Sequence, residues 1–224
     1  MISRIHLSVL VWAIAGLWVL CLALDGTQVS TGLFKPCSTV VTGLGLLLLA
    51  FDKWFWKFRF LHPWFVDRPY IKGTWKGTLV SHWVDPKTNQ PVGPIDAYLV
   101  VRQTFSSIHL RLITRQSSSE SLANNIPKDP DGVYTIASIY RNTPKIANRA
   151  TSEIHHGGVI LQVLGDPIHA LEGHYWTDRG TLGELRFLEK SEKLYFDFDS
   201  ASQSHFQARV GPGSNSLSSD KSSA

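Results

Sequence analysis

Aromatic, hydroxyl, amide and guanidinium side chains gather at the ends of three stretches of alternating sequence. Tyr140-Arg141-Asn142 ends one stretch, Tyr175-Trp176-Thr177-Asp178-Arg179 ends a second, and Thr114 with Ser117 ends a third. Aromatic faces stack on planar rings, hydroxyls and amides hydrogen-bond to base edges, and guanidinium groups bind phosphate. The mixture is therefore typical of a site for a planar, anionic ligand. The same side chains are also ordinary at strand ends, so composition alone leaves both interpretations open.

Common catalytic motifs do not occur in the sequence. It contains no Gly-x-Ser-x-Gly, no Gly-x-x-x-x-Gly-Lys and no Cys-x-x-Cys. The pair His155-His156 cannot bind one metal ion within a strand, because neighbouring side chains point to opposite faces. We therefore expect a protein that is not an enzyme, without catalytic residues, a metal site or a cofactor.

Residues after about position 70 alternate with a period of two, which is typical of strands. The expected strands cover residues 70–83, 95–105, 108–115, 133–142, 159–164, 170–177, 182–189 and 194–198. The serine-rich segment 117–121 and the proline-containing segment 126–132 are expected to form one long connection. Short strands connected in sequence predict an antiparallel up-and-down barrel or a sandwich. We favour a lipocalin-like eight-stranded barrel, because closure removes edge strands and encloses room for one small ligand.

Two apolar runs precede the strands, at residues 5–24 and 33–51. Each is close to the roughly 20 residues that cross a hydrocarbon core of about 30 Å, which predicts a transmembrane hairpin. A cleaved signal peptide is the alternative for the first run, although that run is longer than the usual apolar region of about 7–15 residues. Small residues that allow close helix packing are Thr39, Thr42, Gly43 and Gly45.

Basic residues follow the second apolar run, at Lys53, Lys57 and Arg59, among the aromatic residues of an interfacial segment. By the positive-inside rule, both termini and the barrel face the cytoplasm, and we expect a multi-pass protein of the bacterial inner membrane. The expected domains are 1–58 for the hairpin, 59–69 for a linker, 70–199 for the barrel and 200–224 for a serine-rich disordered tail. The formal net charge of +4 is modest and decides little alone. No DNA or RNA polymer is expected as a partner.

The order of several short motifs resembles a known family. These motifs are Gly73-Thr74-Trp75-Lys76-Gly77, Arg102-Gln103-Thr104, Thr114 with residues 117–121, Tyr140-x-Asn142-x-Pro144, His156-Gly157-Gly158 and Gly173-x-Tyr175-x-Thr177-x-Arg179-x-Thr181-x-Gly183. Together with the two apolar runs, they resemble the two-transmembrane, β-strand-rich effectors of bacterial cyclic-oligonucleotide-based antiphage signalling systems (CBASS). The resemblance extends to about residue 190.

The resemblance implies a minimal β-barrel that binds a cyclic dinucleotide of the 3',3' type, made by a neighbouring nucleotidyltransferase (CD-NTase) during phage infection. Binding is then expected to cause self-association of the membrane module, contact with lipid, disruption of the inner membrane and abortive infection. The alternative is a membrane-tethered, lipocalin-like barrel that binds an apolar ligand and does not disrupt membranes.

Within the matching motifs, the resemblance suggests a role for each candidate residue. Tyr140 and Tyr175 are candidates for stacking on bases, and Arg179 is the candidate for phosphate. The candidates for polar contacts are Asn142, Thr177, Thr114 and Ser117. Arg102 and Arg111 are further candidates, although strand alternation could equally point them to solvent.

Overall fold

The computed structural model describes residues 12, 14–16, 18–20, 23, 37–62, 64–84, 88–150 and 152–208, with the side chains of 37–40 excepted. The chain divides into two compact units. The N-terminal unit comprises Met1–Arg68 and Thr104–Ser106, and the barrel unit comprises Pro69–Gln103 and Ser107–Ala224.

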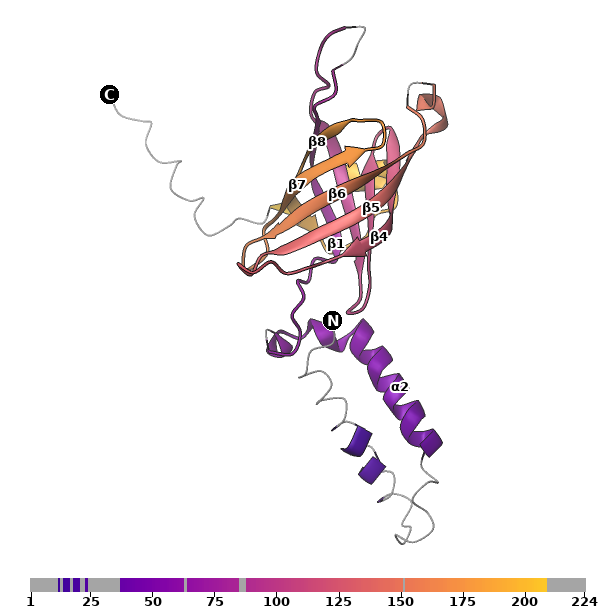
Figure 1. The fold of residues 1–224 in the computed structure, drawn as a ribbon, viewed down its shortest axis with the longest axis vertical. Helices are drawn as coiled ribbons and strands as arrows, with labels where there is room; N and C mark the ends of the chain where they lie inside the picture. Colours follow the sequence, from indigo (N-terminus) through magenta and orange to yellow (C-terminus); the bar gives the residue numbers. More distant parts are fainter. Residues whose placement is uncertain are drawn as a thin grey trace, which may run out of the picture. The chain divides into compact units, whose positions relative to one another are not determined.

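Eight antiparallel strands form a closed barrel in which each strand pairs with the next and β1 also pairs with β8. Figure 1 shows this closed wall. The strands are β1 (Gly73–Ser81), β2 (Ile95–Gln103), β3 (Ile108–Thr114), β4 (Ser117–Asn125), β5 (Tyr134–Pro144), β6 (His155–Leu164), β7 (Ala170–Thr177) and β8 (Leu182–Ser191). The predicted eight-stranded up-and-down barrel is confirmed.

Strand β4 is one of two differences from the predicted strands. The serine-rich segment pairs with β3 on one side and β5 on the other, so the prediction of a connection at residues 117–121 is wrong. The serines have groups to bond with inside the barrel. Ser119 Oγ donates to Asn142 Oδ1 at 2.8 Å, and Ser121 Oγ accepts from the Leu110 N–H at 2.9 Å. These cross-strand bonds outweigh the low β-propensity of serine.

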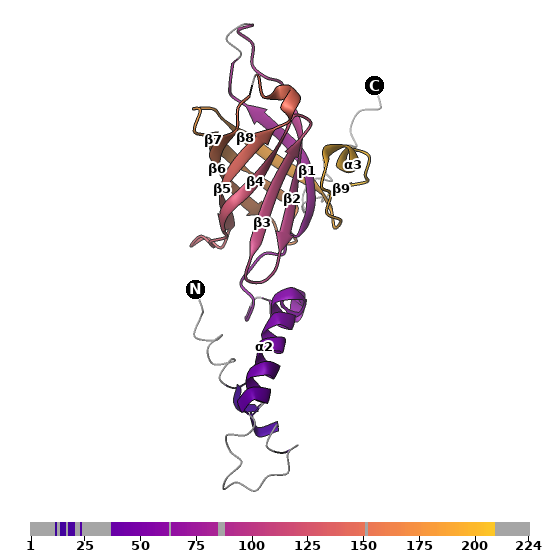
Figure 2. The ribbon, with the colours of Figure 1, turned by 90° about the vertical axis from the view of Figure 1, so that its right-hand side faces the viewer.

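Residues 194–198 are the second difference, because they lie outside the named strands of the barrel. They lead into α3 (Phe198–Ser202), whose first turn is capped by Asp197, and then into the short strand β9 (Gln207–Ala208) on β8. Phe198, Ala201 and Phe206 pack against Tyr98 and Val100, which are the outward-facing residues of β2. Figure 2 shows α3 and β9 outside the barrel wall. The expected tail is therefore structured as far as residue 208, and 209–224 lie outside the described residues.

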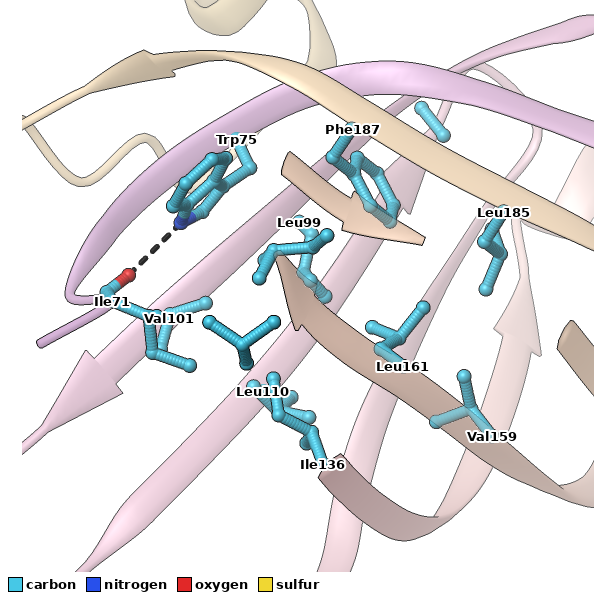
Figure 3. Close-up of a cluster of buried hydrophobic side chains, with 13 residues drawn as sticks. Ile71, Trp75, Leu99, Val101, Leu110, Ile136, Val159, Leu161, Leu185 and Phe187 are labelled. Atoms are coloured by element: carbon cyan, nitrogen blue, oxygen red, sulfur yellow. Dashed lines mark hydrogen bonds between the residues drawn. The ribbon is translucent and has the colours of Figure 1, made fainter. Parts of the chain in front are cut away.

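The end of the barrel at which β1 begins is filled by apolar side chains. Trp75, Ile71 and Phe187 are fully buried there, and Ile136 and Leu171 belong to the same cluster. Figure 3 shows the side chains of Ile71, Trp75, Ile136 and Phe187 between the strands, with the Trp75 indole N–H donating to the Ile71 carbonyl at 2.9 Å. This cluster closes one end of the barrel.

Gln103 holds the segment before β1 against the closed end. Its Oε1 accepts from the Ile71 N–H at 3.0 Å, and its Nε2 donates to the Pro69 carbonyl at 2.8 Å. Both bonds are buried, and such bonds satisfy backbone groups that would otherwise be costly to remove from water. The chain thus enters the barrel domain through its closed end.

In the N-terminal unit, the second apolar run forms α2 (Cys37–Lys53), which is followed by η1 (Phe55–Lys57) and η2 (Arg59–Leu61). Helix α2 has 17 residues, and across the part of the chain that the structure describes no helix combines the length and the apolar character needed to span a bilayer. This finding contradicts the predicted transmembrane hairpin and the predicted multi-pass inner-membrane localisation. Most of the first run, residues 5–24, lies outside the described residues.

Among the predicted packing residues of the second run, Gly45 has open space beside it in the described part of the chain. Thr42 is exposed, Gly43 is half-buried, and nothing lies within 4 Å of the position that a Cβ of Gly45 would occupy. The side chain of Thr39 is outside the described residues. At the end of α2, Phe51 packs edge-on against Phe65 and Phe105, which gives this unit a small aromatic centre of its own.

Candidate functional site

A cavity of about 850 Å³ occupies the barrel on the side away from the closed end. This volume lies within the range of about 300–1,000 Å³ that small-molecule sites occupy. Its inner part is aliphatic and includes Leu79, Leu99, Leu110, Leu161 and Leu185. Its outer part is rich in hydroxyl and amide groups. The cavity therefore offers apolar contact at depth and hydrogen bonds at the mouth.

Most of the predicted site residues line this cavity. They are Thr114, Ser117, Tyr140, Asn142, Tyr175, Thr177 and Arg179. In an up-and-down barrel, successive strands run in opposite directions, so every second strand ends at the same end of the barrel. Here the odd-numbered strands end at the mouth, and residues from β3, β5 and β7 therefore meet there although they are far apart in sequence. Their roles toward a ligand stay predictions.

Arg102 and Arg111 lie on the outside of the barrel. The Arg102 guanidinium lies over the Phe196 ring at 4.9 Å, and Arg111 forms an ion pair with Glu120. Arg111 stands between Leu110 and Leu112, which both line the cavity, so strand alternation turns it outward. The structure therefore does not place either arginine with the other candidates.

Several further residues line the cavity that were not among the predicted site residues. Those that carry polar groups are Ser81, Gln116, Ser119, Ser121, Ser138, Ser152, His155 and Thr181, and Trp83 adds an aromatic ring near the mouth. Serine occupies every second position from 117 to 121, and alternate positions of a strand share one face. This pattern could have indicated a hydroxyl-bearing strand face, but the prediction of a connection at these residues did not include it.

Hydrogen bonds fix the orientation of the polar groups near the mouth. Since Asn142 Oδ1 accepts from Ser119, its Nδ2 is the group that can donate into the cavity. The hydroxyls of Thr177 and Thr181 lie 2.7 Å apart, and those of Thr114 and Ser117 lie 3.2 Å apart. Burial raises the pKa of the Tyr140 hydroxyl well above its ordinary value, so this hydroxyl is neutral and able to donate.

The turn between β7 and β8 holds Arg179 at the mouth. The Asp178 carboxylate accepts from the His156 N–H at 3.0 Å, and this bond lowers the pKa of that carboxyl. Arg179 itself is exposed, and its Nη1 lies 3.4 Å from Ser152 Oγ. Among the described residues that line the cavity, Arg179 is the one permanent cation and none is a carboxylate. The mouth therefore favours an anion.

His155 is buried on the cavity side of β6, while its neighbour His156 is exposed. His155 Nδ1 lies 2.9 Å from the Glu153 carbonyl and donates to it, which leaves Nε2 as an acceptor. Burial lowers the pKa of His155, so this imidazole is neutral near pH 7. Within the described part of the chain, no group of histidine, cysteine and acidic residues could hold a metal ion.

The lowered pKa of His155 makes stability depend on pH. In the unfolded chain, histidine takes up a proton near its ordinary pKa of about 6.5, whereas folded His155 does so only at lower pH. Between these two values the unfolded state binds more protons, so acidification below about pH 6.5 should destabilise the barrel until the folded pKa is passed. Urea unfolding at pH 7 and pH 5 should show a smaller difference for His155→Gln than for the wild type. An equal difference would contradict this, and His205→Gln, an exposed site, is the control.

A closed eight-stranded barrel with one filled end and one hydrogen-bonding mouth defines a small-molecule receptor domain. Residues 66–189 match the family described as "Cap15, cyclic dinucleotide receptor domain", and the chain belongs to this family. It is also similar to CD-NTase-associated protein 15 of Yersinia aleksiciae, with 29% identity over 134 residues that cover 58% of each chain. The alignment thus spans less than two thirds of that relative. Both matches agree with the family that the motifs resemble, and the description of the matched family names a cyclic dinucleotide receptor domain.

Proposed function

We propose that the barrel receives a 3',3'-type cyclic dinucleotide in its cavity and that binding switches the chain on as a CBASS effector. The observation that carries this proposal is the composition of the mouth. Tyr140, Tyr175, Asn142, Thr177 and Arg179 come from two separate strands and the turn after β7, and all line one cavity. Stacking rings, base-edge donors and a phosphate partner are the three contacts that such a ligand needs.

The cavity also suits this ligand by its gradient of polarity. Phosphates are placed best at the mouth, where the exposed Arg179 meets them and water remains close. The bases extend inward, where the tyrosines and leucines offer flat and apolar surfaces. The described lining contains no carboxylate, which limits the repulsion that two phosphate charges would meet on entering.

The chain is proposed to act by binding and not by catalysis, with the messenger as its ligand and no cofactor. A neighbouring CD-NTase is the proposed source of that messenger, which agrees with the name of the Yersinia aleksiciae relative. Self-association of effector copies is the proposed step after binding, because a ligand that favours one association state shifts the equilibrium toward it.

The aliphatic inner part of the cavity favours one second candidate, the binding of an apolar ligand. Leu79, Leu99, Leu110, Leu112 and Leu185 would contact a hydrocarbon chain. On this alternative, the hydrogen-bonding groups at the mouth would contribute little to affinity.

Calorimetry on the purified full-length protein separates the two candidates. We expect one member of a cyclic-dinucleotide panel to bind saturably, and a fatty acid neither to bind nor to compete. Asn142→Leu should weaken binding of the nucleotide by roughly tenfold, because it removes a donor and leaves Ser119 without its acceptor. Asn125→Leu, at the exposed end of β4, is the matched control. Failure of the whole panel to bind, or displacement by the fatty acid, would refute the proposal.

A further inference from the structure

Tyr140 and Tyr175 each lie across a glycine of the following strand. Tyr140 is paired with Gly157 between β5 and β6, and Tyr175 is paired with Gly183 between β7 and β8. A Cβ added to Gly157 would lie 2.5 Å from the Tyr140 hydroxyl oxygen, and one added to Gly183 would lie 2.9 Å from the Tyr175 hydroxyl oxygen. Each ring thus occupies space that only glycine leaves open, and it extends sideways along the barrel wall.

The contacts of the two rings fit this sideways orientation. The Tyr140 hydroxyl donates to the carbonyl of Trp176, a residue of β7, at 3.4 Å, so its side chain spans the whole of β6. Both tyrosines pack against the hydrophobic core cluster, which includes the cavity-lining Leu161 and Leu185, and both tyrosines also line the cavity. A ring that packs on the wall with one side presents its other side to the lumen.

The same arrangement therefore occurs twice, two strands apart. Two positions nearer the mouth, each tyrosine is followed by a buried hydrogen-bonding residue on the same face, which is Asn142 on β5 and Thr177 on β7. Each of these is held by a further hydroxyl, Ser119 in the first case and Thr181 in the second. The barrel wall carries two similar half-sites, each with one ring and one polar group above it.

We propose that the two half-sites bind the two bases of one cyclic dinucleotide, one base on each tyrosine. This inference rests on the proposed function and adds to it that each tyrosine contacts one base. A cyclic dinucleotide carries two bases on one macrocycle, and stacking on an aromatic ring contributes separately for each base. Two rings that stem from strands β5 and β7 provide separate platforms, in contrast to a pair of rings that sandwiches one base.

The glycines are part of this arrangement. At Gly157 or Gly183, a side chain would collide with the tyrosine ring where it now lies, so the ring could not keep its place along the wall. A Cβ at either position would also lie 2.2 Å from a backbone oxygen, that of Trp176 or of Val80. Since alanine there could disturb the strands themselves, the informative substitutions are those of the tyrosines.

A double-mutant cycle tests whether the platforms are separate. Tyr140→Leu and Tyr175→Leu should each raise the Kd of the full-length protein for the bound cyclic dinucleotide roughly tenfold. If each ring holds its own base, the double variant should multiply the two factors, to about a hundredfold. If both rings hold the same base, the double variant will bind about as well as the weaker single variant, which would overturn the proposal. Tyr134→Leu changes a tyrosine outside the lining and is the control.

A second measurement does not depend on the folding of variants. The wild-type protein should bind a cyclic dinucleotide that lacks one base roughly tenfold more weakly than the intact ligand. Equal affinity for the two ligands would overturn the proposal. If no cyclic dinucleotide binds the wild type at all, the proposed function itself has failed. The two failures are therefore distinguishable.

Discussion

Trp75→Ala is expected to lower the free energy of unfolding of the barrel by about 3–5 kcal/mol, the usual cost of truncating a fully buried aromatic residue. Trp75 has no exposed surface, and its indole N–H donates to the Ile71 carbonyl at 2.9 Å. The Lys190 ammonium also lies 5.6 Å from its ring centre. Because small domains have a total stability of about 5–15 kcal/mol, this loss should be visible as a large shift in urea unfolding.

Trp83→Ala is the matched control for this substitution. Trp83 lies near the mouth and remains 43% exposed, so its removal should cost about 0.5 kcal/mol or less. Unfolding followed by circular dichroism of the strands would compare the two variants. Similar losses for both would mean that the apolar cluster at the closed end does not dominate the stability of the barrel.

Arg179→Ala is expected to weaken binding of the cyclic dinucleotide by about 10- to 100-fold. A charge-assisted hydrogen bond contributes about 1.5–3 kcal/mol, and Arg179 is the permanent cation of the described lining. The turn that carries Arg179 should keep its conformation in this variant. The Asp178 carboxylate accepts from the His156 N–H, and the hydroxyls of Thr177 and Thr181 lie within hydrogen-bonding distance. Calorimetry at low and high salt would also show a weaker salt dependence for the variant, because screening acts on the lost attraction.

Arg102→Ala is the control for charge. It removes the same guanidinium from the outer wall, where it lies over Phe196, and it should leave the Kd unchanged. If Arg102→Ala weakened binding as much as Arg179→Ala, long-range attraction and not contact at the mouth would explain both results. That outcome would contradict the assigned place of the phosphates.

Alternation along the strands made much of the site predictable. Tyr140 and Asn142 are two positions apart and share a face, as are Tyr175 and Thr177, so their convergence follows once an up-and-down barrel is assumed. The same rule turns Arg111, which stands between two leucines, toward the outside of the barrel wall. Its place on the outer face is thus the outward orientation that strand alternation had left open for it.

Other features depended on contacts that a single sequence does not display. Strand β4 is built from serines whose partners lie on β3 and β5, so its local composition indicates a loop. The apolar run 194–198 is typical of a strand, but its residues Leu194, Tyr195 and Phe198 cover the outside of β2 and β3. The tyrosine–glycine pairs depend on strand register, which is fixed only when the barrel closes.

The filled end of the barrel has a kinetic consequence. Since Trp75, Ile71 and Phe187 occupy that end, the described residues leave the mouth as the route by which a molecule enters and leaves the cavity. On the proposed function, residence time would be set at the mouth, by how quickly Arg179 and the groups beside it release the phosphates. Slow release would keep the protein occupied after synthesis of the messenger stops, so the rate of dissociation through the mouth would set how long the response lasts.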